Sequence, residues 1–279
     1  EKLDKYPGGR HCDKSTGHSG AVHCLSLSSD GRYLASGGAD SLIHIWDVRS
    51  NRKLDGLEGH RDVVSGSCFR RGTHTLYTSS FDRTIKVWDV DQMGYVETLF
   101  GHQEPVSAID ALHQEKCVSC GADSSARLWK VAEESHLVFR YTSPRAALDV
   151  TSNVDCIRYI NPTHFATGAQ DGTVSLWTSQ KKKPLVSIAN AHGEGNWISA
   201  LGGVRGTDVI VSGSCDGKIR FYATGKGIKG LSPIKEVDVA GFINGVDCSK
   251  DGSIVVAAVG QEHRLGRWWR QKNVSNGLS

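Results

Sequence analysis

The sequence repeats one short motif, an acidic residue followed six positions later by an aromatic residue. The six pairs are Asp40 and Trp46, Asp82 and Trp88, Asp123 and Trp129, Asp171 and Trp177, Asp216 and Tyr222, and Glu262 and Trp268. The aromatic residues lie 42, 41, 48, 45 and 46 positions apart. A period of about 40–50 residues is typical of repeat proteins in which each unit is one small structural module. The chain is therefore expected to stack several copies of one module.

The first copy shows what that module is. Residues 21–27, 32–36, 42–46 and 53–57 read as four short strands separated by turn residues such as Asp30-Gly31 and Asp40. Such a sheet has two apolar faces, which are buried only when neighbouring sheets cover both. The sequence therefore predicts an all-β WD40 β-propeller, with residues 17–279 forming a single domain of propeller repeats.

The start of the chain leaves the number of blades open. Residues 2–8 (KLDKYPG) resemble residues 53–59 (KLDGLEG), the fourth strand of the first repeat. We expect residues 1–16 to supply an outer strand and a linker. That strand either completes the last of six blades or belongs to a preceding seventh blade whose other strands are not in this sequence.

A polar group of four residues recurs with the repeat. A Trp N–H, a hydroxyl, a His and a turn carboxylate can satisfy one another's hydrogen bonds where water is excluded. We predict that these groups, here called tetrads, are structural and hold neither a metal nor a catalytic pair. The tetrads are His18, Ser36, Asp40 and Trp46; His60, Thr78, Asp82 and Trp88; and His102, Ser119, Asp123 and Trp129. Repeat four lacks the His, since Val150 occupies its position, and repeat six has lost most of the set.

Composition excludes several classes of protein. The eight cysteines are expected to be free thiols, with Cys24, Cys156 and Cys248 in one small buried slot two residues after an inward Val. No second pair accompanies the C-x-x-C of Cys117 and Cys120, so no metal site is predicted. No phosphate loop or nucleophile-base set is present, so we expect no enzyme and no cofactor. No apolar run approaches the roughly 18 residues of a membrane span.

Several segments differ from the general pattern of the repeat and are similar to one family. They are residues 69–74 (FRRGTH), 96–103 (VETLFGHQ), 133–139 (EESHLVF), 241–244 (GFIN) and 259–270 (VGQEHRLGRWWR). Together they closely resemble the WD40 subunit specific to the U3 small nucleolar ribonucleoprotein, a box C/D particle, over essentially the whole chain. Residues 140–153 depart from the family pattern, so contacts of that loop are not carried over.

The resemblance implies a function and a set of partners. It implies a non-enzymatic, RNA-associated, monomeric subunit of a ribonucleoprotein in the nucleus and nucleolus. The expected partners are the box B/C region of U3 snoRNA, the box C/D core proteins including the small kink-turn-binding protein, and small-subunit processome proteins. The implied role is pre-rRNA processing for the small ribosomal subunit. Members of this family look seven-bladed, which favours a missing first blade.

Three basic clusters are candidates for RNA or particle contact. The first is His263, Arg264, Arg267, Trp269 and Arg270, where arginine and an aromatic ring could contact phosphate and stack on an unpaired base. The second is Arg70, Arg71 and His74, at a turn between two strands. The third is the run Lys181, Lys182 and Lys183 in a loop between third and fourth strands. Each cluster has a structural alternative. Trp269 could pack on the rim, and Arg267 could form an ion pair with a carboxylate such as Glu262. The other two clusters could be solvated charge without a partner.

Two other functions fit parts of the sequence. Trp46-Asp47-Val48-Arg49 matches the W-D-x-R signature of substrate receptors of cullin-type ubiquitin ligases. A generic peptide-binding scaffold also remains open, because propellers often use the mouth of the ring in that way. The net charge of +3 is low, so we expect weak binding to naked RNA and stronger binding to a preassembled protein-RNA platform.

Overall fold

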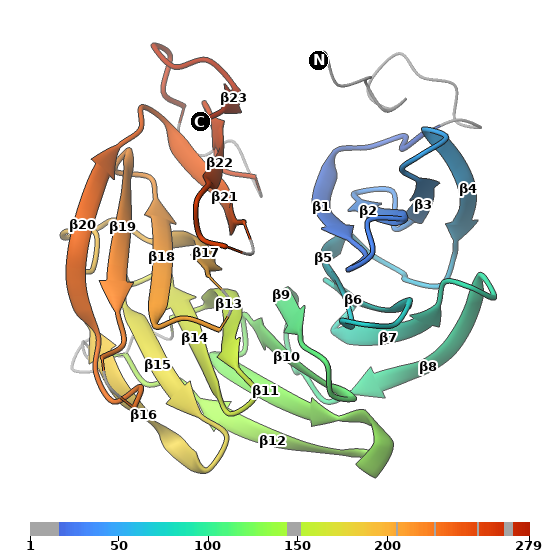
Figure 1. The fold of residues 1–279 in the computed structure, drawn as a ribbon, viewed down its shortest axis with the longest axis horizontal. Helices are drawn as coiled ribbons and strands as arrows, with labels where there is room; N and C mark the ends of the chain where they lie inside the picture. Colours follow the sequence, from blue (N-terminus) through green and yellow to red (C-terminus); the bar gives the residue numbers. More distant parts are fainter. Residues whose placement is uncertain (1–16, 144–151, 205, 226, 250, 265–269) are drawn as a thin grey trace. The chain divides into compact units, whose positions relative to one another are not determined.

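The chain is a series of small antiparallel sheets (Figure 1). This computed structural model describes residues 17–143, 152–204, 206–225, 227–249, 251–264 and 270–279. Within these residues it contains β-strands and one 3₁₀ turn, η1 (Val131–Glu133). No described helix could cross a membrane. The all-β prediction is therefore confirmed.

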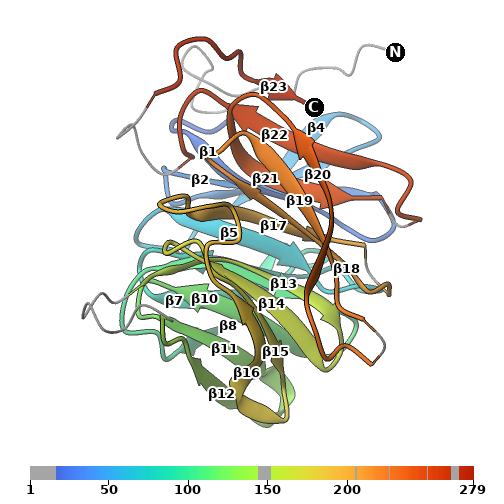
Figure 2. The same ribbon diagram turned by 90° about the vertical axis from the view of Figure 1, so that its left-hand side faces the viewer.

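Each sheet is a meander in which strands pair with their neighbours in the sequence (Figures 1 and 2). The first sheet consists of β1 (Val22–Leu27), β2 (Tyr33–Gly38), β3 (Ile43–Asp47) and β4 (Arg52–Leu57). The second consists of β5 (Val64–Phe69), β6 (Thr75–Ser80), β7 (Thr84–Asp89) and β8 (Gly94–Phe100). The third consists of β9 (Val106–Ala111), β10 (Lys116–Gly121), β11 (Ser125–Lys130) and β12 (Ser135–Arg140). The fourth consists of β13 (Val154–Asn161), β14 (His164–Ala169), β15 (Val174–Thr178) and β16 (Lys181–Ile188). The fifth consists of β17 (Ile198–Gly203), β18 (Val209–Ser214), β19 (Lys218–Ala223) and β20 (Ser232–Asp238). The sixth consists of β21 (Phe242–Cys248), β22 (Val255–Gly260) and β23 (Gly277–Leu278).

The residues group into two compact units, each described separately. The first comprises Glu1–Ser119 and Lys130–Ser135, and the second comprises Cys120–Trp129 and His136–Ser279. The first unit holds the first two sheets, and the second unit holds the last three. The single domain expected over residues 17–279 stays a prediction. The outer strand expected in residues 1–16 lies outside the described residues.

Within each unit, successive sheets pack face to face through their inner strands. Ser65 of β5 donates its hydroxyl hydrogen to the Val106 carbonyl of β9 at 2.5 Å, and Ser199 of β17 does the same to Ile243 of β21 at 2.6 Å. A Cβ on Gly37 of β2 would lie only 2.5 Å from a Val64 methyl group. This close packing buries both faces of a sheet, as the repeat pattern predicts. The outer strand β20, in contrast, is exposed along its whole length.

A bulge in the first strand positions the small residue of each repeat. The register shifts after Val22, before Cys24, and equally between Ile243 and Gly245 in the sixth sheet. Cys24 and Cys156 occupy the predicted slot, but in the sixth sheet it belongs to Gly245, whereas Cys248 pairs with Val255. The prediction for Cys248 was wrong because it was counted from Val246, and the strand faces inward at Ile243.

The sixth sheet also differs from the predicted repeat. The sequence suggested a third strand ending near Trp268, but residues 265–269 lie outside the described residues. The described strand beside β22 is β23, in which Leu278 pairs with Ala258. No motif in the sequence indicated this pairing. In the described residues of the sixth sheet, the strand paired with β22 on this side is therefore not the one that the repeat pattern predicts.

Candidate functional site

The first two tetrads form the predicted hydrogen-bonded chains. His18 Nδ1 lies 2.9 Å from Asp40, and His18 Nε2 lies 2.8 Å from the Ser36 hydroxyl, which accepts the Trp46 N–H at 2.9 Å. His60, Thr78, Asp82 and Trp88 repeat this chain with distances of 2.8–2.9 Å. Burial raises the pKa of Asp82, but the hydrogen bonds from His60 and Thr84 outweigh it, so the net shift is downward. The carboxylates are thus ionised and fully engaged in structure.

The later repeats keep parts of this chain. In the first unit His102 Nε2 lies 2.7 Å from the Ser119 hydroxyl. In the second unit Asp123 accepts hydrogen bonds from the backbone and hydroxyl of Ser125, and Trp129 is buried. In the fifth repeat His192 lies 3.0 Å from Asp216 and 2.6 Å from Ser212. The tetrad therefore serves the turn and the third strand of each repeat.

In repeat four, which lacks the tetrad histidine, other side chains bind the turn carboxylate, and the sequence did not indicate them. The Tyr141 hydroxyl donates to Asp171 at 2.7 Å, and the Ser143 hydroxyl donates to the same carboxylate oxygen at 2.5 Å. Trp177 still donates to Thr167 at 2.8 Å. Burial raises the pKa of Tyr141, so its hydroxyl stays a donor at neutral pH. The segment after β12 thus replaces the imidazole with two hydroxyl groups.

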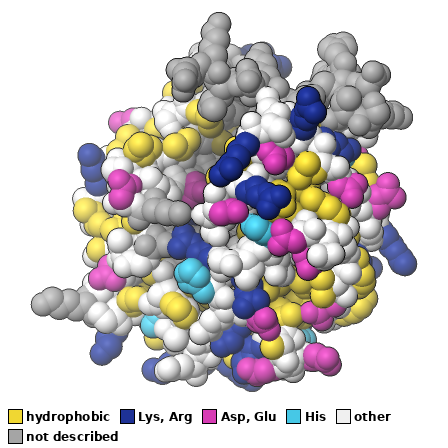
Figure 3. All heavy atoms as spheres, turned by 45° about the vertical axis from the view of Figure 1, so that its right-hand side comes forward, with side chains coloured by type: hydrophobic (Ala, Val, Ile, Leu, Met, Phe, Trp, Pro, Cys, Tyr) yellow, Lys and Arg dark blue, Asp and Glu magenta, His cyan; other side chains and the backbone are white. Residues whose placement is uncertain are grey.

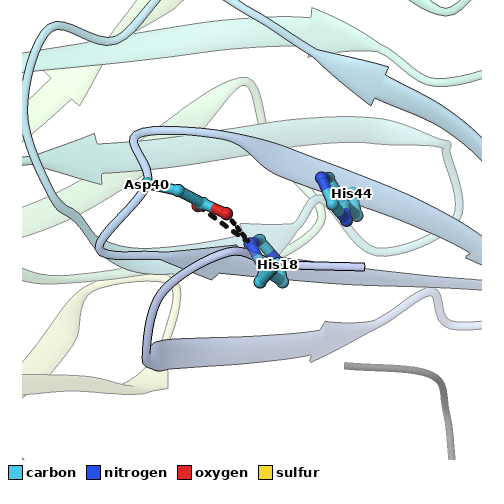
Figure 4. Close-up of side chains that lie close together, drawn as sticks. All are labelled: His18, Asp40 and His44. Carbon is cyan, nitrogen blue, oxygen red and sulfur yellow. Dashed lines mark hydrogen bonds and ion pairs between the residues drawn. The ribbon is translucent and has the colours of Figure 1, made fainter. Parts of the chain in front are cut away.

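One tetrad brings two imidazoles and a carboxylate together, as a metal site would. The ligand atoms of His18, Asp40 and His44 lie within 4.8 Å of one another (Figure 4). The two imidazole rings, however, are stacked with centroids 4.1 Å apart and planes 11° from parallel. Ring nitrogens bind metals in the plane of the ring, so parallel rings do not converge on one ion. Both nitrogens of His18 are also engaged, by Asp40 and Ser36. The geometry fits packing and does not fit a metal centre.

The C-terminal cluster follows β22 and is organised by Asn244. The Asn244 side chain donates to the Glu262 carbonyl at 2.9 Å and accepts the Arg264 N–H at 2.9 Å. Gln261 binds Val274 and, through its backbone N–H, the Asn276 side chain at 2.8 Å. These contacts frame a polar cavity of about 480 Å³. Asn244 lies in a segment that carries the family resemblance, but its hydrogen bonds to the loop of Glu262 and Arg264 were not predicted.

The predicted contact residues of this cluster differ in their exposure. His263 is 9% exposed and packs 5.1 Å from the Trp197 ring. Burial, followed by the charge of Arg264, lowers the pKa of His263 to about 4, so the ring is neutral at pH 7. Burial raises the pKa of Asp155 on β13 to about 6, while the Gln170 hydrogen bond and the Arg264 charge oppose this rise. His263 and Arg264 therefore contribute to packing and charge balance within the second unit.

Arg270 is the exposed cation of this cluster. Its side chain is 59% exposed, donates to Gln261 Oε1 at 2.8 Å and lies 3.6 Å from Glu262 Oε1. Glu262, which the sequence offers as a partner for Arg267, thus lies beside Arg270. Arg267, Trp268 and Trp269 lie outside the described residues. Contact of any of these residues with RNA stays a prediction.

The second predicted cluster is neutralised by carboxylates. Arg70 Nη1 donates to Glu115 at 2.8 Å, and its Nε donates to the His113 carbonyl at 3.0 Å. His74 lies 2.8 Å from Asp91 and 3.0 Å from Asp30, one on each ring nitrogen. The pKa of His74 is raised, because the two carboxylates outweigh the effect of burial. Arg71 is half-buried, and its backbone N–H donates to the Leu112 carbonyl just after β9, at 3.1 Å.

The third predicted cluster is the most accessible. Lys181, Lys182 and Lys183 are exposed, and none of them has an ion pair among the described residues. They lie at the start of β16, where Lys181 pairs with Thr178, and not in a loop as predicted. The turn is shorter than expected because the strand extends to its first lysine. On the face seen in Figure 3, by contrast, Lys and Arg side chains are interspersed with Asp and Glu.

Comparison with known proteins gives consistent matches. The family described as "WD domain, G-beta repeat" matches residues 10–47, 51–89 and 94–130. A solved structure described as "Structure of U3-55K" is 45% identical with a TM-score of 0.89, covering 94% of this chain and 80% of that one. A second, described as "Crystal structure of RRP9 WD40 repeats", matches equally well. The all-β propeller class predicted from the repeats is confirmed by these matches.

Full-length relatives extend the comparison. The human "U3 small nucleolar RNA-interacting protein 2" is 45% identical over 274 residues, which are 95% of this chain and 56% of that protein. The Saccharomyces cerevisiae "Ribosomal RNA-processing protein 9" is 26% identical over 331 residues, covering 94% of this chain and 58% of that protein. The chain thus spans little more than half the length of these relatives.

Proposed function

This chain belongs to the family of WD40 proteins associated with the U3 small nucleolar ribonucleoprotein, and on that premise we propose that it is an RNA-associated scaffold of this particle. The observation that carries the proposal is the 45% identity to a solved U3-55K structure across 94% of the chain. We assign no catalytic activity to the scaffold, because its histidine-aspartate pairs belong to structural tetrads that recur in several repeats.

The finer part of the proposal concerns partners and place. The chain associates with the box B/C region of U3 snoRNA, alongside the kink-turn-binding protein and other box C/D core proteins. It supports pre-rRNA processing for the small ribosomal subunit, together with processome proteins, in the nucleus and nucleolus. It acts there as a monomeric subunit. The names of relatives that refer to U3 RNA and to ribosomal RNA processing support this assignment.

The exposed cations are the residues that we assign to RNA. Lys181, Lys182 and Lys183 are free of ion pairs among the described residues, and Arg270 is largely exposed. Such groups release counterions from phosphates when they bind, so they give affinity that falls with salt. Arg267 and Trp269 remain in the proposal on the strength of the sequence alone. Arg70 and His74 rank lower, because carboxylates already neutralise them.

An electrophoretic shift titration tests the proposal. The chain is titrated against U3 RNA with and without the kink-turn-binding protein, and an unrelated box C/D RNA serves as the control. We expect tighter binding to the preassembled complex than to naked RNA, because the basic clusters are small. Equal affinities for the two, or equal affinity for the unrelated RNA, would refute the proposal.

A variant without the three lysines of β16 tests whether these residues contact the RNA. Replacing Lys181, Lys182 and Lys183 with Ser should weaken binding and reduce the dependence of log affinity on log salt by about two to three. The matched control replaces three dispersed, exposed cations, Arg49, Lys229 and Lys235, with Ser. If both variants lose the same affinity, only net charge matters and the assignment to β16 fails.

The ubiquitin-ligase alternative depends on four residues. Trp46 is buried, and Asp47 accepts a hydrogen bond from the Ser50 N–H at 2.8 Å, so both serve the local fold. Only Arg49 is exposed and available to a partner. Affinity purification of the tagged chain from nuclear extract separates the two functions. The scaffold function requires recovery of U3 RNA, whereas the alternative requires recovery of the ligase adaptor.

A further inference from the structure

The second sheet carries a basic cavity that the sequence did not indicate. It has a volume of about 640 Å³ and lies within the first unit. Three cationic side chains line it, from Arg61, Arg83 and Lys86. The carboxylate that lines it, Asp82, is already engaged by His60 and by the backbone N–H of Arg61. The cavity therefore has an excess of positive charge.

Two of the three cations of this cavity have neutral partners. Arg83 Nη1 donates to the Gln103 carbonyl at 3.2 Å. Lys86 Nζ donates to the Thr98 hydroxyl at 2.8 Å and lies 5.1 Å from the centroid of the Tyr95 ring. Among the described residues, no ion pair involves Arg61, Arg83 or Lys86. The charges of Arg83 and Lys86 are thus held in place without being neutralised, unlike that of Arg70.

The backbone at Arg83 supports a functional reading. Arg83 has a φ of 70°, in the left-handed region, at the turn between β6 and β7. The corresponding turn positions hold small residues in other repeats: Ser41, Ser124, Gly172 and Gly217. A long side chain is more strained in this region than glycine, and such strain tends to occur at binding sites. The turn therefore presents a guanidinium at a position where glycine, which two other repeats have, would adopt the backbone conformation without strain.

An exposed aromatic ring completes the set. Phe100, the last residue of β8, lines the same cavity and is 73% exposed. Single exposed apolar side chains are common on protein surfaces, so it is the combination of this ring with the cations around it that points to a ligand. Sites for unpaired nucleotides combine cations that meet phosphate with aromatic rings on which bases stack. A site for an acidic peptide needs the cations but not the ring.

We propose that this cavity binds an unpaired nucleotide of RNA, with the base stacked on Phe100 and the phosphate at Arg83 and Arg61. The proposal rests on the RNA-associated function proposed above, and it adds a site in the second repeat that is separate from β16 and from the C-terminal cluster. Lys86, which also lines the cavity, contributes further positive charge.

Crosslinking locates the nucleotide. U3 RNA substituted with 4-thiouridine is assembled with the kink-turn-binding protein and the full chain, then irradiated and digested for mass spectrometry. We expect a crosslinked peptide that contains Phe100. If the RNA crosslinks only to peptides of the C-terminal cluster or β16, the nucleotide site is wrong and the proposed function stands. If no part of the chain crosslinks or binds, the proposed function fails.

Variants test the roles of the residues. Phe100→Ala should weaken binding to the assembled RNA about tenfold, and Phe100→Trp should retain it. Arg83→Ser, which installs the residue found at positions 41 and 124, should weaken binding and lower the salt dependence by about one. Arg49→Ser is the matched control on another exposed turn and should have no effect. Unchanged binding by both Phe100→Ala and Arg83→Ser would overturn the proposal.

The same variants exclude a peptide ligand. Fluorescence anisotropy with a polyglutamate peptide and a phosphoserine peptide is measured beside that with oligouridine. We expect binding of oligouridine that depends on Phe100. Binding of either peptide in a manner that depends on Arg83 but not on Phe100, with no binding of oligouridine, would assign the cavity to a protein partner and overturn the nucleotide proposal.

Discussion

The second sheet carries an arginine at each of two turns, and the two differ in what surrounds them. Arg70 lies between β5 and β6, whereas Arg83 lies between β6 and β7, at the opposite end of the antiparallel sheet. Glu115 neutralises Arg70 at 2.8 Å, whereas the described residues offer the Arg83 guanidinium the carbonyl of Gln103 at 3.2 Å and no carboxylate. Whether a cation can bind another molecule therefore depends on its partners in the fold and not on the density of cations in the sequence.

The surroundings of the two turns extend this difference. At the Arg70 end, His74 is held between Asp30 and Asp91. At the Arg83 end, the one carboxylate that lines the cavity, Asp82, is part of a tetrad. The sequence ranks the Arg70 turn higher, because two arginines and a histidine occur within five residues. The structure reverses this order.

The largest expected effect comes from removing the carboxylate that shapes the Arg83 turn. Asp82→Ala leaves His60 and the N–H groups of Arg61 and Thr84 without their acceptor. Loss of a buried charged partner should cost about 3 kcal/mol of unfolding free energy, measured by urea denaturation. Asp251→Ala at an exposed turn is the control and should cost much less. Equal losses would mean that the tetrad does not stabilise the Arg83 turn.

The next effect compares the two arginines directly. Arg83→Ser should lower the affinity for the assembled U3 RNA about five- to tenfold, whereas Arg70→Ser should change it less than about twofold. Filter binding at two salt concentrations measures both. A larger loss for Arg70→Ser than for Arg83→Ser would reverse the comparison.

A smaller effect is expected from pH. His74 has its pKa raised above the ordinary value of 6.5 by Asp91 and Asp30, against the effect of burial. Its ion pairs therefore stabilise the fold below about pH 6.5, and this stabilisation is lost as the pH rises through the raised pKa. The melting temperature of the wild type relative to His74→Gln should be about 1–2 °C higher at low pH than at high pH. A constant difference across this range would contradict the assigned ion pairs.

His44 should show the opposite trend. Burial, followed by the charges of His18 and Lys53, lowers its pKa to about 4. The neutral ring is favoured in the folded state, so the fold loses stability as the pH falls from about 6.5 towards 4. Comparison of the wild type with His44→Gln over that range by thermal melting measures this loss. Since His263 shares the trend, the loss should shrink in the variant and not vanish.

A still smaller effect is expected when Arg70 loses its ion pair with Glu115. Glu115→Gln removes the anion beside Arg70 but keeps the shape of the side chain. We expect the affinity for the assembled RNA to rise by less than about threefold at low salt, because one half-buried cation loses its ion pair. The same variant in an Arg70→Ser background should have no effect. A rise that persists without Arg70 would point to net charge as the cause.

The sequence predicted the fold better than it predicted the site. The Asp-to-aromatic spacing identified the repeats, and the tetrad of His18, Ser36 and Asp40 was predicted residue by residue. The errors arose where the repeat pattern weakens. Cys248 was placed in the slot of Gly245 because the repeat was counted from Val246 and not from Ile243, and Tyr141 was missed because a phenol from outside the motif replaced the histidine.

The sequence by itself determined the repeating sheet and the residues that fasten each turn, because both depend on contacts within some 25 residues of one another. It also carried the family resemblance. Only the tertiary structure decided which cations are available, because Glu115 reaches Arg70 from another sheet, and Arg83 shares its cavity with Phe100 from a different strand. Ion pairing and exposure depend on three-dimensional neighbours that no local spacing in the chain encodes.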